Sequence, residues 1–441
     1  MRLAEFDPRA CDSFAFVERE WQPRQGRLLL HYRLGRQELT ETFEFPSPAR
    51  TVADLDALEA AFDLLHWIAG ISYWKAACPQ RVAFGQRAPD RWQADWLNRL
   101  YAQGLAEFAY RQQLPAGWLA PFWGDAEPVP RAQSQGLDQA LLVPMGGGKD
   151  SLVAWARLAR IDRVGATVQV GASELIRTVA GRTGARHFSI GRAMDPKLAE
   201  LNAAGALNGH VPITAINAAA MIVLALLHGY GGIAFANERS AEEPTLISAN
   251  GQPVNHQFAK TLAFERMLDG WVRHYIASDL EVFSILRRDR ELAICREFAG
   301  LTSFHDVFSS CNRNFHLDGP RTGRWCGQCP KCHFVFLCLA PFMAPASLRA
   351  VFGADLLDDQ SQLDGFARLL ALDGEKPFEC VGEAEEARAA LLALSRSEHW
   401  RQHAVVSALA PRLAKVDVTA LDVLCQPGGD HLIPHELRDA N

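Results

Sequence analysis

Short apolar runs alternate with amphipathic stretches between about residue 137 and residue 238. Their periods predict strands at 139–145, 163–171, 185–191 and 231–238, and helices at 151–160, 172–184 and 212–229. Strands and helices that alternate at this spacing build a doubly wound parallel sheet with helices on both faces. Such α/β sheets bind ligands outside the carboxyl ends of their strands, so we expect the functional site there.

The composition is that of an ordinary globular protein. The chain has 441 residues, 49% of them apolar, and a formal net charge of -6. This length predicts roughly two to four domains. The negative balance argues against a nucleic-acid or membrane-surface partner, so an anionic ligand would need local Lys and Arg side chains. The N-terminal segment lacks the apolar core of a signal peptide, and we expect a cytoplasmic protein.

The most apolar stretch, residues 215–236, is long enough to cross a bilayer. His228 and the glycines that follow it divide this stretch in two. We therefore predict a buried helix, a tight turn and a buried strand rather than a membrane span.

Changes in sequence texture divide the chain into four predicted regions. Residues 1–134 begin with alternating strand-like sequence and continue as helices to about Leu114, the first of them capped by Thr51 or Asp54. A stretch rich in Pro and Gly then serves as a linker. We predict an N-terminal α+β domain at 1–134, which is a candidate for substrate binding, the α/β domain at 135–300, a metal-binding segment at 301–345 and a mainly helical region at 346–441.

A glycine-rich loop, "VPMGGGKDS", follows the first strand of the alternating region. A loop between a strand and a helix offers free backbone N–H groups to an anion, and glycines let that backbone approach a phosphate closely. The stretch does not match the Walker A pattern, because Asp150 follows Lys149, and it lacks the third glycine of the Rossmann pattern.

Half of the ten cysteines fall between Cys311 and Cys338. Overlapping C-x2-C steps and one distant cysteine can supply four thiolates to a tetrahedral metal ion. The candidate ligands are Cys311, Cys326, Cys329 and Cys332. We favour a structural zinc ion, with an iron–sulfur cluster as the alternative.

The stretch "GGGKDS" resembles the S-G-G-x-D-S loop of the N-type ATP pyrophosphatases (PP-loop enzymes), with glycine in place of the usual first serine. The resemblance implies the HUP-like α/β fold of that family, and ATP as a cofactor cleaved to AMP and pyrophosphate. It also implies that Asp150 holds Mg²⁺ and that Lys149 neutralises charge on the leaving pyrophosphate. The implied nucleotide-binding residues are Gly146, Gly147, Gly148, Lys149, Asp150 and Ser151.

Six segments in order resemble the MurL family of UDP-N-acetylmuramoyl-L-alanyl-L-glutamate epimerases. They are "VPMGGGKDS", "FANERSAEEPT", "PVNHQFAKTLAFE", "RWCGQCPKCHFVFLCLAPF", "KPFECVGE" and "LIPHELR". This resemblance spans nearly the whole chain. It implies an ATP- and Mg²⁺-dependent inversion of the terminal L-glutamate of a UDP-muramoyl dipeptide through an acyl-adenylate, in peptidoglycan precursor synthesis.

Five further residues are candidates for catalysis. Glu238 and Arg239 follow a predicted strand, and Arg239 could pair with a carboxylate or a phosphate; the alternative is a charged surface loop. His256 and Lys260 would share one face of a helix and serve as acid or base; the alternative is an exposed, capped helix. Cys380 is a candidate proton-transfer thiol, although lone cysteines are usually inert core residues.

Two other functions fit the same motifs. The glycine loop and the cysteine cluster also occur together in 7-cyano-7-deazaguanine synthase, which would make the protein a different kind of adenylating enzyme. A non-catalytic nucleotide sensor with a metal site is the second alternative. The sequence does not determine the oligomeric state.

Overall fold

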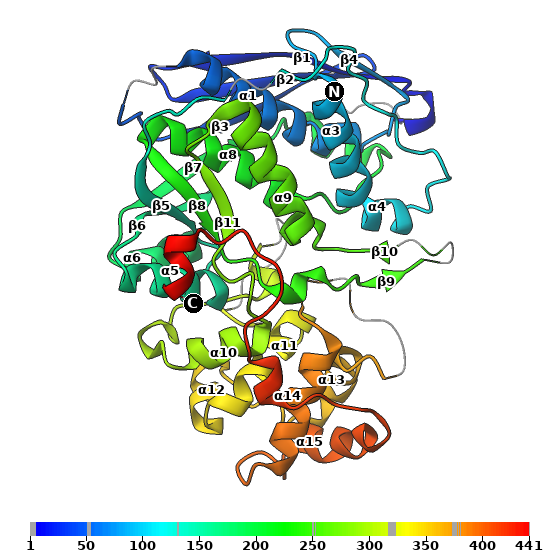
Figure 1. Ribbon diagram of the computed structural model, residues 1–441. Coiled ribbons are helices and arrows are strands. Elements are labelled where there is room, and N and C mark those ends of the chain that lie inside the picture. The colour runs from blue at the N-terminus through cyan, green and yellow to red at the C-terminus, as the bar shows by residue number, and fades with distance from the viewer. Residues whose placement is uncertain are drawn as a thin grey trace.

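One large sheet runs through the upper part of the molecule (Figure 1). The computed structural model describes residues 6–50, 54–129, 132–248, 251, 253–315, 323–372, 377, 379 and 381–440. The sheet has nine strands in the order β11-β8-β5-β6-β7-β3-β2-β1-β4. The strands are β1 (Ser13–Gln22), β2 (Arg27–Leu34), β3 (Gln37–Glu44), β4 (Arg81–Phe84), β5 (Asp138–Pro144), β6 (Val164–Val170), β7 (His187–Ala193), β8 (Tyr230–Phe235) and β11 (Glu281–Ser284). Strands β9 (Leu246–Ile247) and β10 (Pro253–Val254) form a separate pair.

The central half of the sheet is parallel, as the alternation of strands and helices predicts. Strands β11, β8, β5, β6 and β7 pair in parallel in that order. The chain leaves β5 toward β6 and β7, and then returns to the other side of β5 for β8 and β11. The expectation of an α/β fold is therefore confirmed.

The N-terminal strands extend this sheet instead of forming one of their own. Strand β3 pairs antiparallel with β7, and β2 and β1 continue the antiparallel half, with Gly35 at φ +57° in the turn between β2 and β3. Strands from both sides of residue 134, where the sequence suggested a domain boundary, therefore belong to one sheet. Strand β4 was not expected in a region predicted to be helical; it pairs with the edge strand β1.

Helices cover both faces of the sheet. Each face of the sheet has its own hydrophobic core. In β5, Leu142 belongs to one core, and its neighbours Leu141 and Val143 belong to the other. The helices are α1 (Leu55–Ala69), α2 (Ile71–Trp74), α3 (Arg91–Gly104), α4 (Ala106–Arg111), α5 (Lys149–Arg160), α6 (Glu174–Arg182), α7 (Lys197–Ala203), α8 (Ile213–His228), α9 (Leu262–Trp271), α10 (Glu291–Ala299), α11 (Pro330–Leu339), α12 (Pro345–Phe352), α13 (Leu363–Leu369), α14 (Ala384–Arg396), α15 (Ala404–Leu409) and α16 (Leu421–Leu424). Helices α1, α8 and α9 pack on one face, and α5, α6 and α10 pack on the other.

The apolar stretch forms the predicted helix, turn and strand. Helix α8 ends at Gly229, whose φ of +84° suits glycine, and β8 follows directly. Burial of each large apolar side chain of α8 contributes about 1.5–3 kcal/mol to stability. Within the described residues, no helix is both long and apolar enough to cross a bilayer. Asp54 caps α1 as expected, whereas Thr51 lies outside the described residues.

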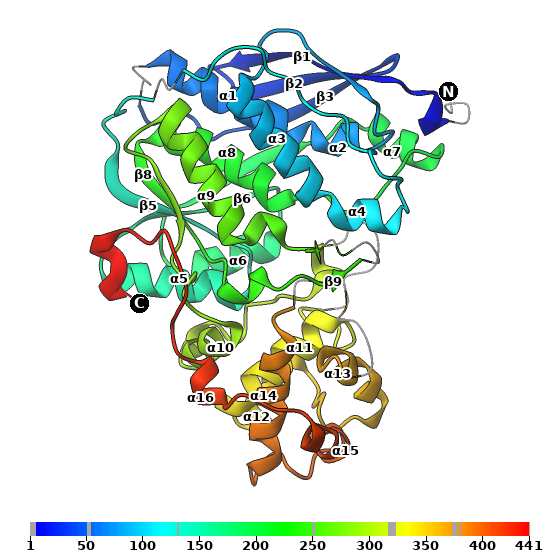
Figure 2. The same cartoon turned by 45° about the vertical axis from the view of Figure 1, so that its right-hand side comes forward.

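The helices after α10 gather beyond the carboxyl ends of the parallel strands, and the final segment turns back to α5 (Figures 1 and 2). Glu386 of α14 joins this helical unit to α10, which packs on the sheet. Its carboxylate is fully buried and accepts hydrogen bonds from Leu292 N at 2.9 Å and Glu383 N at 3.2 Å. Burial and the nearby charge of Glu291 raise the pKa of Glu386 from 4.5 to about 8.

Replacement of Glu386 by Gln should flatten the dependence of stability on pH. Between pH 4.5 and about 8 the folded state keeps a proton on Glu386 that the unfolded state releases, so stability falls as pH rises through this window. The slope is at most about 1.4 kcal/mol per pH unit. Urea unfolding across the window should give a smaller slope for Glu386→Gln than for the wild type. The exposed control Glu398→Gln should keep the wild-type slope.

Candidate active site at the carboxyl ends of the parallel strands

The loops after β5 and β8 meet where the strand order reverses. Strand β5 leads into the loop at 145–148, and β8 leads into the segment that contains Glu238. Strand β11 ends at the same edge and leads to Glu291 at the start of α10. Adjacent loops diverge at such a point and leave a crevice for ligands, so the sheet itself brings these residues together.

The glycine loop ends directly on a helix N-terminus. Gly148 precedes α5, and no side chain caps this helix end, so its first N–H groups face the loop. Gly147 has φ +79°, which suits glycine. A Cβ on Gly148 would lie 2.4 Å from Ser310 Oγ, whereas a Cβ on Gly146 would meet no atom within 4 Å. The Ser151 hydroxyl lies beside the glycine loop, where its Oγ accepts from Gly146 N at 3.4 Å.

Lys149 does not extend into solvent. Its side chain is fully buried, and its Nζ donates to both Asp150 Oδ1 and Glu291 Oε2. Burial disfavours the cation, but these two carboxylates outweigh that effect and raise the pKa of Lys149 well above its ordinary value. Lys149 is thus a permanent charge between α5 and α10, and Asp150 remains the more accessible partner, with 23% of its side chain exposed.

Two more lysines surround the same carboxylates. Lys331 Nζ lies 3.5 Å from Glu291 Oε1, and its side chain is 9% exposed. Burial opposes ionisation of Asp150, but Lys149, Lys331 and Lys260 outweigh it and lower the pKa of this carboxyl. Asp150 is therefore held in its ionised form beside the glycine loop, with positive charge around it.

Glu238 and Arg239 occupy different surroundings. Glu238 is 4% exposed, and burial together with the charge of Glu291 raises its pKa. The Glu238 carboxyl thus lies within electrostatic reach of Glu291, Lys260 and Asp150. The Arg239 guanidinium instead lies against the C-terminal segment, where a Cβ on Gly428 would be 2.7 Å from its Nη1.

The four predicted cysteines converge and could hold a metal ion. Their sulfurs all lie within 4.8 Å of one another. Cys329 Sγ is 3.4 Å from Cys332 Sγ and 4.0 Å from Cys311 Sγ. The backbone N–H groups of Gln328 and Cys329 donate to Cys326 Sγ at 3.4 and 3.3 Å.

This cysteine cluster packs behind the glycine loop. Ser309 N donates to Gly147 O at 2.9 Å, two residues before Cys311. Helix α11 begins within the cluster. Its residue Lys331 lies between two of the cysteines in sequence and extends toward Glu291. The metal-binding segment therefore forms one wall of the candidate active site.

His256 and Lys260 do not share a helix, contrary to expectation. His256 lies in a turn, Lys260 ends a short 3-10 helix at Phe258–Lys260, and Thr261 caps α9 through its Oγ1, which accepts from Phe264 N at 3.2 Å. The Lys260 Nζ donates to Gln257 Oε1 at 3.3 Å. His256 Nδ1 instead hydrogen-bonds Glu107 Oε2.

The His256 site includes a second imidazole. His210 Nδ1 lies 3.7 Å from Glu107 Oε2, and the two rings are 4.5 Å apart. Burial and the neighbouring His256 lower the pKa of His210 to about 4, so its imidazole is neutral at pH 7. Burial opposes ionisation of Glu107, but its bond to His256 and the surrounding positive groups lower the pKa of this carboxyl.

Cys380 lies outside the described residues. Of the described residues beside it, Glu379 Oε2 accepts from Asn312 Nδ2, and Val381 O accepts from Gln257 Nε2 at 3.5 Å.

The sequence analysis missed Glu291, Lys331, Glu386, Glu107 and His210. Glu291 follows the end of a parallel strand, and Lys331 lies between two predicted metal ligands, so these two left a signal in the sequence. The others are brought in by long-range contacts; Glu107 and His256 are 149 positions apart.

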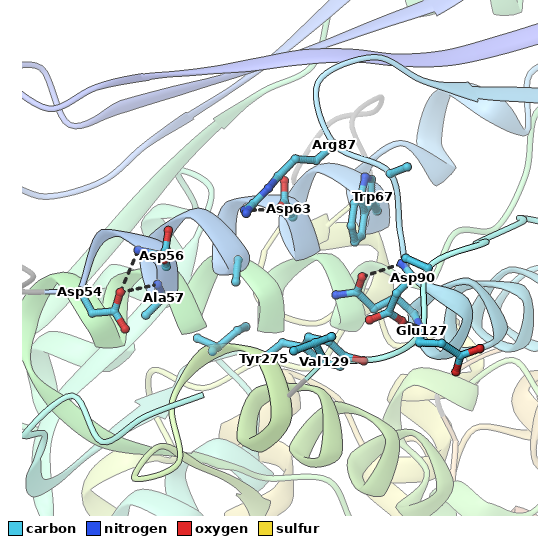
Figure 3. A pocket seen from close by; sticks show the side chains of 15 residues that line it. Asp54, Asp56, Ala57, Asp63, Trp67, Arg87, Asp90, Glu127, Val129 and Tyr275 are labelled. Atoms are coloured by element: carbon cyan, nitrogen blue, oxygen red, sulfur yellow. Dashed lines mark hydrogen bonds and ion pairs between the residues drawn. The ribbon is translucent and has the colours of Figure 1, made fainter. Parts of the chain in front are cut away.

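A separate cavity, lined by none of these residues, lies between α1 and the π-helical turn Val272–Ile276 (Figure 3). Its charged lining is mostly acidic and consists of Asp54, Asp56, Asp63, Asp90, Glu127 and Arg87. Asp63 already accepts from Arg87 Nη1 at 3.0 Å. An acidic wall of this kind disfavours a phosphorylated ligand.

Comparisons with known proteins agree along the whole chain. The MurL N-terminal domain model matches residues 5–285, and the MurL C-terminal domain model matches residues 307–423. A protein of Xanthomonas oryzae pv. oryzae (strain MAFF 311018) named UDP-N-acetyl-alpha-D-muramoyl-L-alanyl-L-glutamate epimerase is 42% identical over 99% of this chain and 98% of its own. A protein of the same name from Salinispora tropica is 39% identical over 98% of this chain and 96% of its own.

No solved structure matches the chain significantly. The two family models and the full-length relatives nevertheless agree with each other and with the order of the motifs. The chain therefore belongs to the MurL family and is an isomerase of the epimerase class.

Proposed function

We propose that the protein inverts the terminal L-glutamate of UDP-MurNAc-L-Ala-L-Glu to D-glutamate, using ATP and Mg²⁺ and releasing AMP and pyrophosphate. The observation that carries this proposal is the glycine loop on the N-terminus of α5, in a chain whose full-length relatives are named for that substrate. The product would serve peptidoglycan precursor synthesis.

The strand order and the loop support a fold of the PP-loop pyrophosphatase type. In this proposal the backbone of Gly146, Gly147 and Gly148 and the hydroxyl of Ser151 bind the phosphates. Asp150 would hold Mg²⁺, which shields phosphate charge when bound. Lys331 and Lys260 lie near Asp150 and would neutralise the leaving pyrophosphate. Lys149 would act indirectly, by holding Asp150 and Glu291 in place.

Adenylation solves the chemical difficulty of this inversion. A free carboxylate resists loss of its α-proton, because the carbanion would form beside a negative charge. Attack of the carboxylate oxygen on the α-phosphorus of ATP expels pyrophosphate and gives a neutral acyl group next to Cα. A base can then remove the Cα proton, and return of a proton on the other face inverts the centre. Hydrolysis of the acyl-adenylate releases AMP and makes the cycle irreversible.

Lys260 and Cys380 are our candidates for the proton transfers, whereas His256 is engaged by Glu107. Lys260 lies close enough to Asp150 to lower its pKa, so it is near the proposed adenylate. Glu238 in the crevice is a further acid–base candidate, because its raised pKa favours the protonated form. Arg239 contacts the C-terminal segment and would reach a substrate carboxylate only from that side.

The functional test follows the hydrogen at Cα. The purified protein, ATP, Mg²⁺ and UDP-MurNAc-L-Ala-L-Glu are mixed in deuterated water. We expect AMP, pyrophosphate and a D-glutamyl product that carries one deuterium at Cα. Recovery of unchanged L-glutamate would disprove the epimerase proposal.

The same assay distinguishes the two rivals. An adenylating enzyme of the 7-cyano-7-deazaguanine synthase type requires an amine co-substrate and changes the product mass in ordinary water. A nucleotide sensor would bind ATP and release no pyrophosphate, with or without the dipeptide.

Replacement of Asp150 by Ala should lower pyrophosphate release at least about a hundredfold, because the cation ligand beside the loop is lost. Lys149 keeps Glu291 as a partner, so the variant should stay folded by circular dichroism. The exposed control Glu174→Gln on α6 should release pyrophosphate at the wild-type rate. Normal turnover by Asp150→Ala would show that the loop has another role.

The cysteine cluster suits a structural zinc ion. Zn–S bonds of about 2.3 Å in a tetrahedron separate the sulfurs by about 3.8 Å. The separations of 3.4, 3.7 and 4.0 Å fit one shared ion. In an iron–sulfur cluster the four cysteines are divided among at least two irons, and sulfurs on different irons lie farther apart than the 4.8 Å limit observed here, so the geometry supports zinc.

Replacement of Cys329 by Ala should remove the zinc and lower the unfolding temperature together, because a structural zinc ion contributes directly to folding. Elemental analysis and thermal unfolding measure the two effects. The control Cys338→Ala changes a buried cysteine of the same helix outside the cluster and should keep the metal. A Cys329 variant with full zinc content would contradict the assignment.

A further inference from the structure

A second group of metal-type ligands lies outside the cysteine cluster. Glu107 comes from α4, His210 from the segment before α8, and His256 from the turn after β10. Each offers a ligand atom, and these atoms lie within 4.8 Å of one another. Three segments far apart in the sequence thus direct two imidazoles and one carboxylate to a single point.

Hydrogen bonds from residues outside this group hold the Glu107 side chain and the two segments that carry the histidines. Arg111 Nε donates to Glu107 Oε1 at 2.7 Å, which leaves Oε2 as the oxygen that faces the histidines. The segment before His210 is fixed through Asn208, whose carbonyl oxygen accepts from Gln112 Nε2 at 2.7 Å. Asn255 anchors the turn of His256 by donating from its Nδ2 to Ala241 O at 3.0 Å. The bond from Arg111 orients the Glu107 carboxylate itself, as outer hydrogen bonds do in protein metal sites, and the other two fix the segments that carry the histidines.

The group is buried on one side and accessible on the other. The Glu107 side chain is 5% exposed, whereas those of His210 and His256 are 19% and 17% exposed. Two histidines and one glutamate form a ligand set typical of catalytic zinc sites, which keep an open position for an oxygen ligand. The partial exposure of the two imidazoles gives that ligand a path to the ion.

We propose that Glu107, His210 and His256 bind a second divalent transition-metal ion of the zinc class. The group shares a wall with the crevice, because Gln257 beside His256 accepts from Lys260 Nζ at 3.3 Å and lies 3.5 Å from Val381 O. If the proposed function holds, an oxygen of the anionic substrate fills the open position. The binding of the ion itself does not depend on that function.

The test measures metal content in the absence of ATP and substrate. The full chain is dialysed, loaded with Zn²⁺ alone, freed of excess ion and analysed. We expect about two equivalents in the wild type, and about one in each of His210→Ala, His256→Ala and the milder Glu107→Gln. His403→Ala removes a histidine that lies 3.3 Å from Asp355 elsewhere, and should keep about two equivalents.

Cobalt substitution shows whether a variant is folded. The cysteine site gives thiolate-to-cobalt charge-transfer bands, and these should persist in the three variants while the second equivalent is lost. One equivalent in the wild type, or two in Glu107→Gln and His210→Ala, would overturn the proposal. Because no ATP is present, these outcomes are independent of whether the protein adenylates its substrate. In the complete assay, we expect the His210 variant to epimerise at least about tenfold more slowly.

Discussion

The buried contact between Lys149 and Glu291 fixes the geometry on which the site depends. The Lys149 side chain is fully buried and that of Glu291 is 1% exposed, so neither charge has solvent as an alternative partner. Removal of one member of such a pair costs about 3–5 kcal/mol, because the other is left buried and uncompensated. The pair therefore holds the first turn of α5 against the start of α10, with Asp150 at the edge of the crevice. An unhindered glycine loop could not keep this arrangement by itself.

The cysteine cluster belongs to the same arrangement. The segment that leads into Cys311 hydrogen-bonds the glycine loop through Ser309, and α11 carries Lys331 from the cluster to Glu291. An ion held by four thiolates would fix the start of α11, and with it the position of one cation beside Asp150. A metal ion bound there would thus be coupled to the electrostatics of the candidate site through Lys331.

The sequence predicted what depends on short-range pattern. Strands β5 to β8 and helices α5, α6 and α8 follow from period, and the convergence of the four cysteines follows from spacing, whereas α7 was not predicted. The predicted helix through His256 and Lys260 was wrong because local side-chain hydrogen bonds override the helical pattern. Asn255 Oδ1 accepts from Gln257 N at 2.7 Å, and Thr261 caps α9, so the helix begins after Lys260. Pattern also failed where partners are distant in sequence, because the contacts of Glu107 with His256 and of Lys149 with Glu291 depend on topology alone.

The local charge at the candidate site differs from the net charge of -6 of the whole chain. The crevice contains Lys149, Lys260 and Lys331 against several carboxyl groups. A pKa of about 8 keeps Glu386 protonated at neutral pH, and the pKa of Glu238 is shifted in the same direction. The positive charges of the three lysines then at least balance the negative charges of Asp150 and Glu291. Burial of the other carboxyl groups thus removes part of the repulsion that the acidic composition would otherwise impose on an anion, and leaves Asp150 as an ionised carboxyl beside the glycine loop.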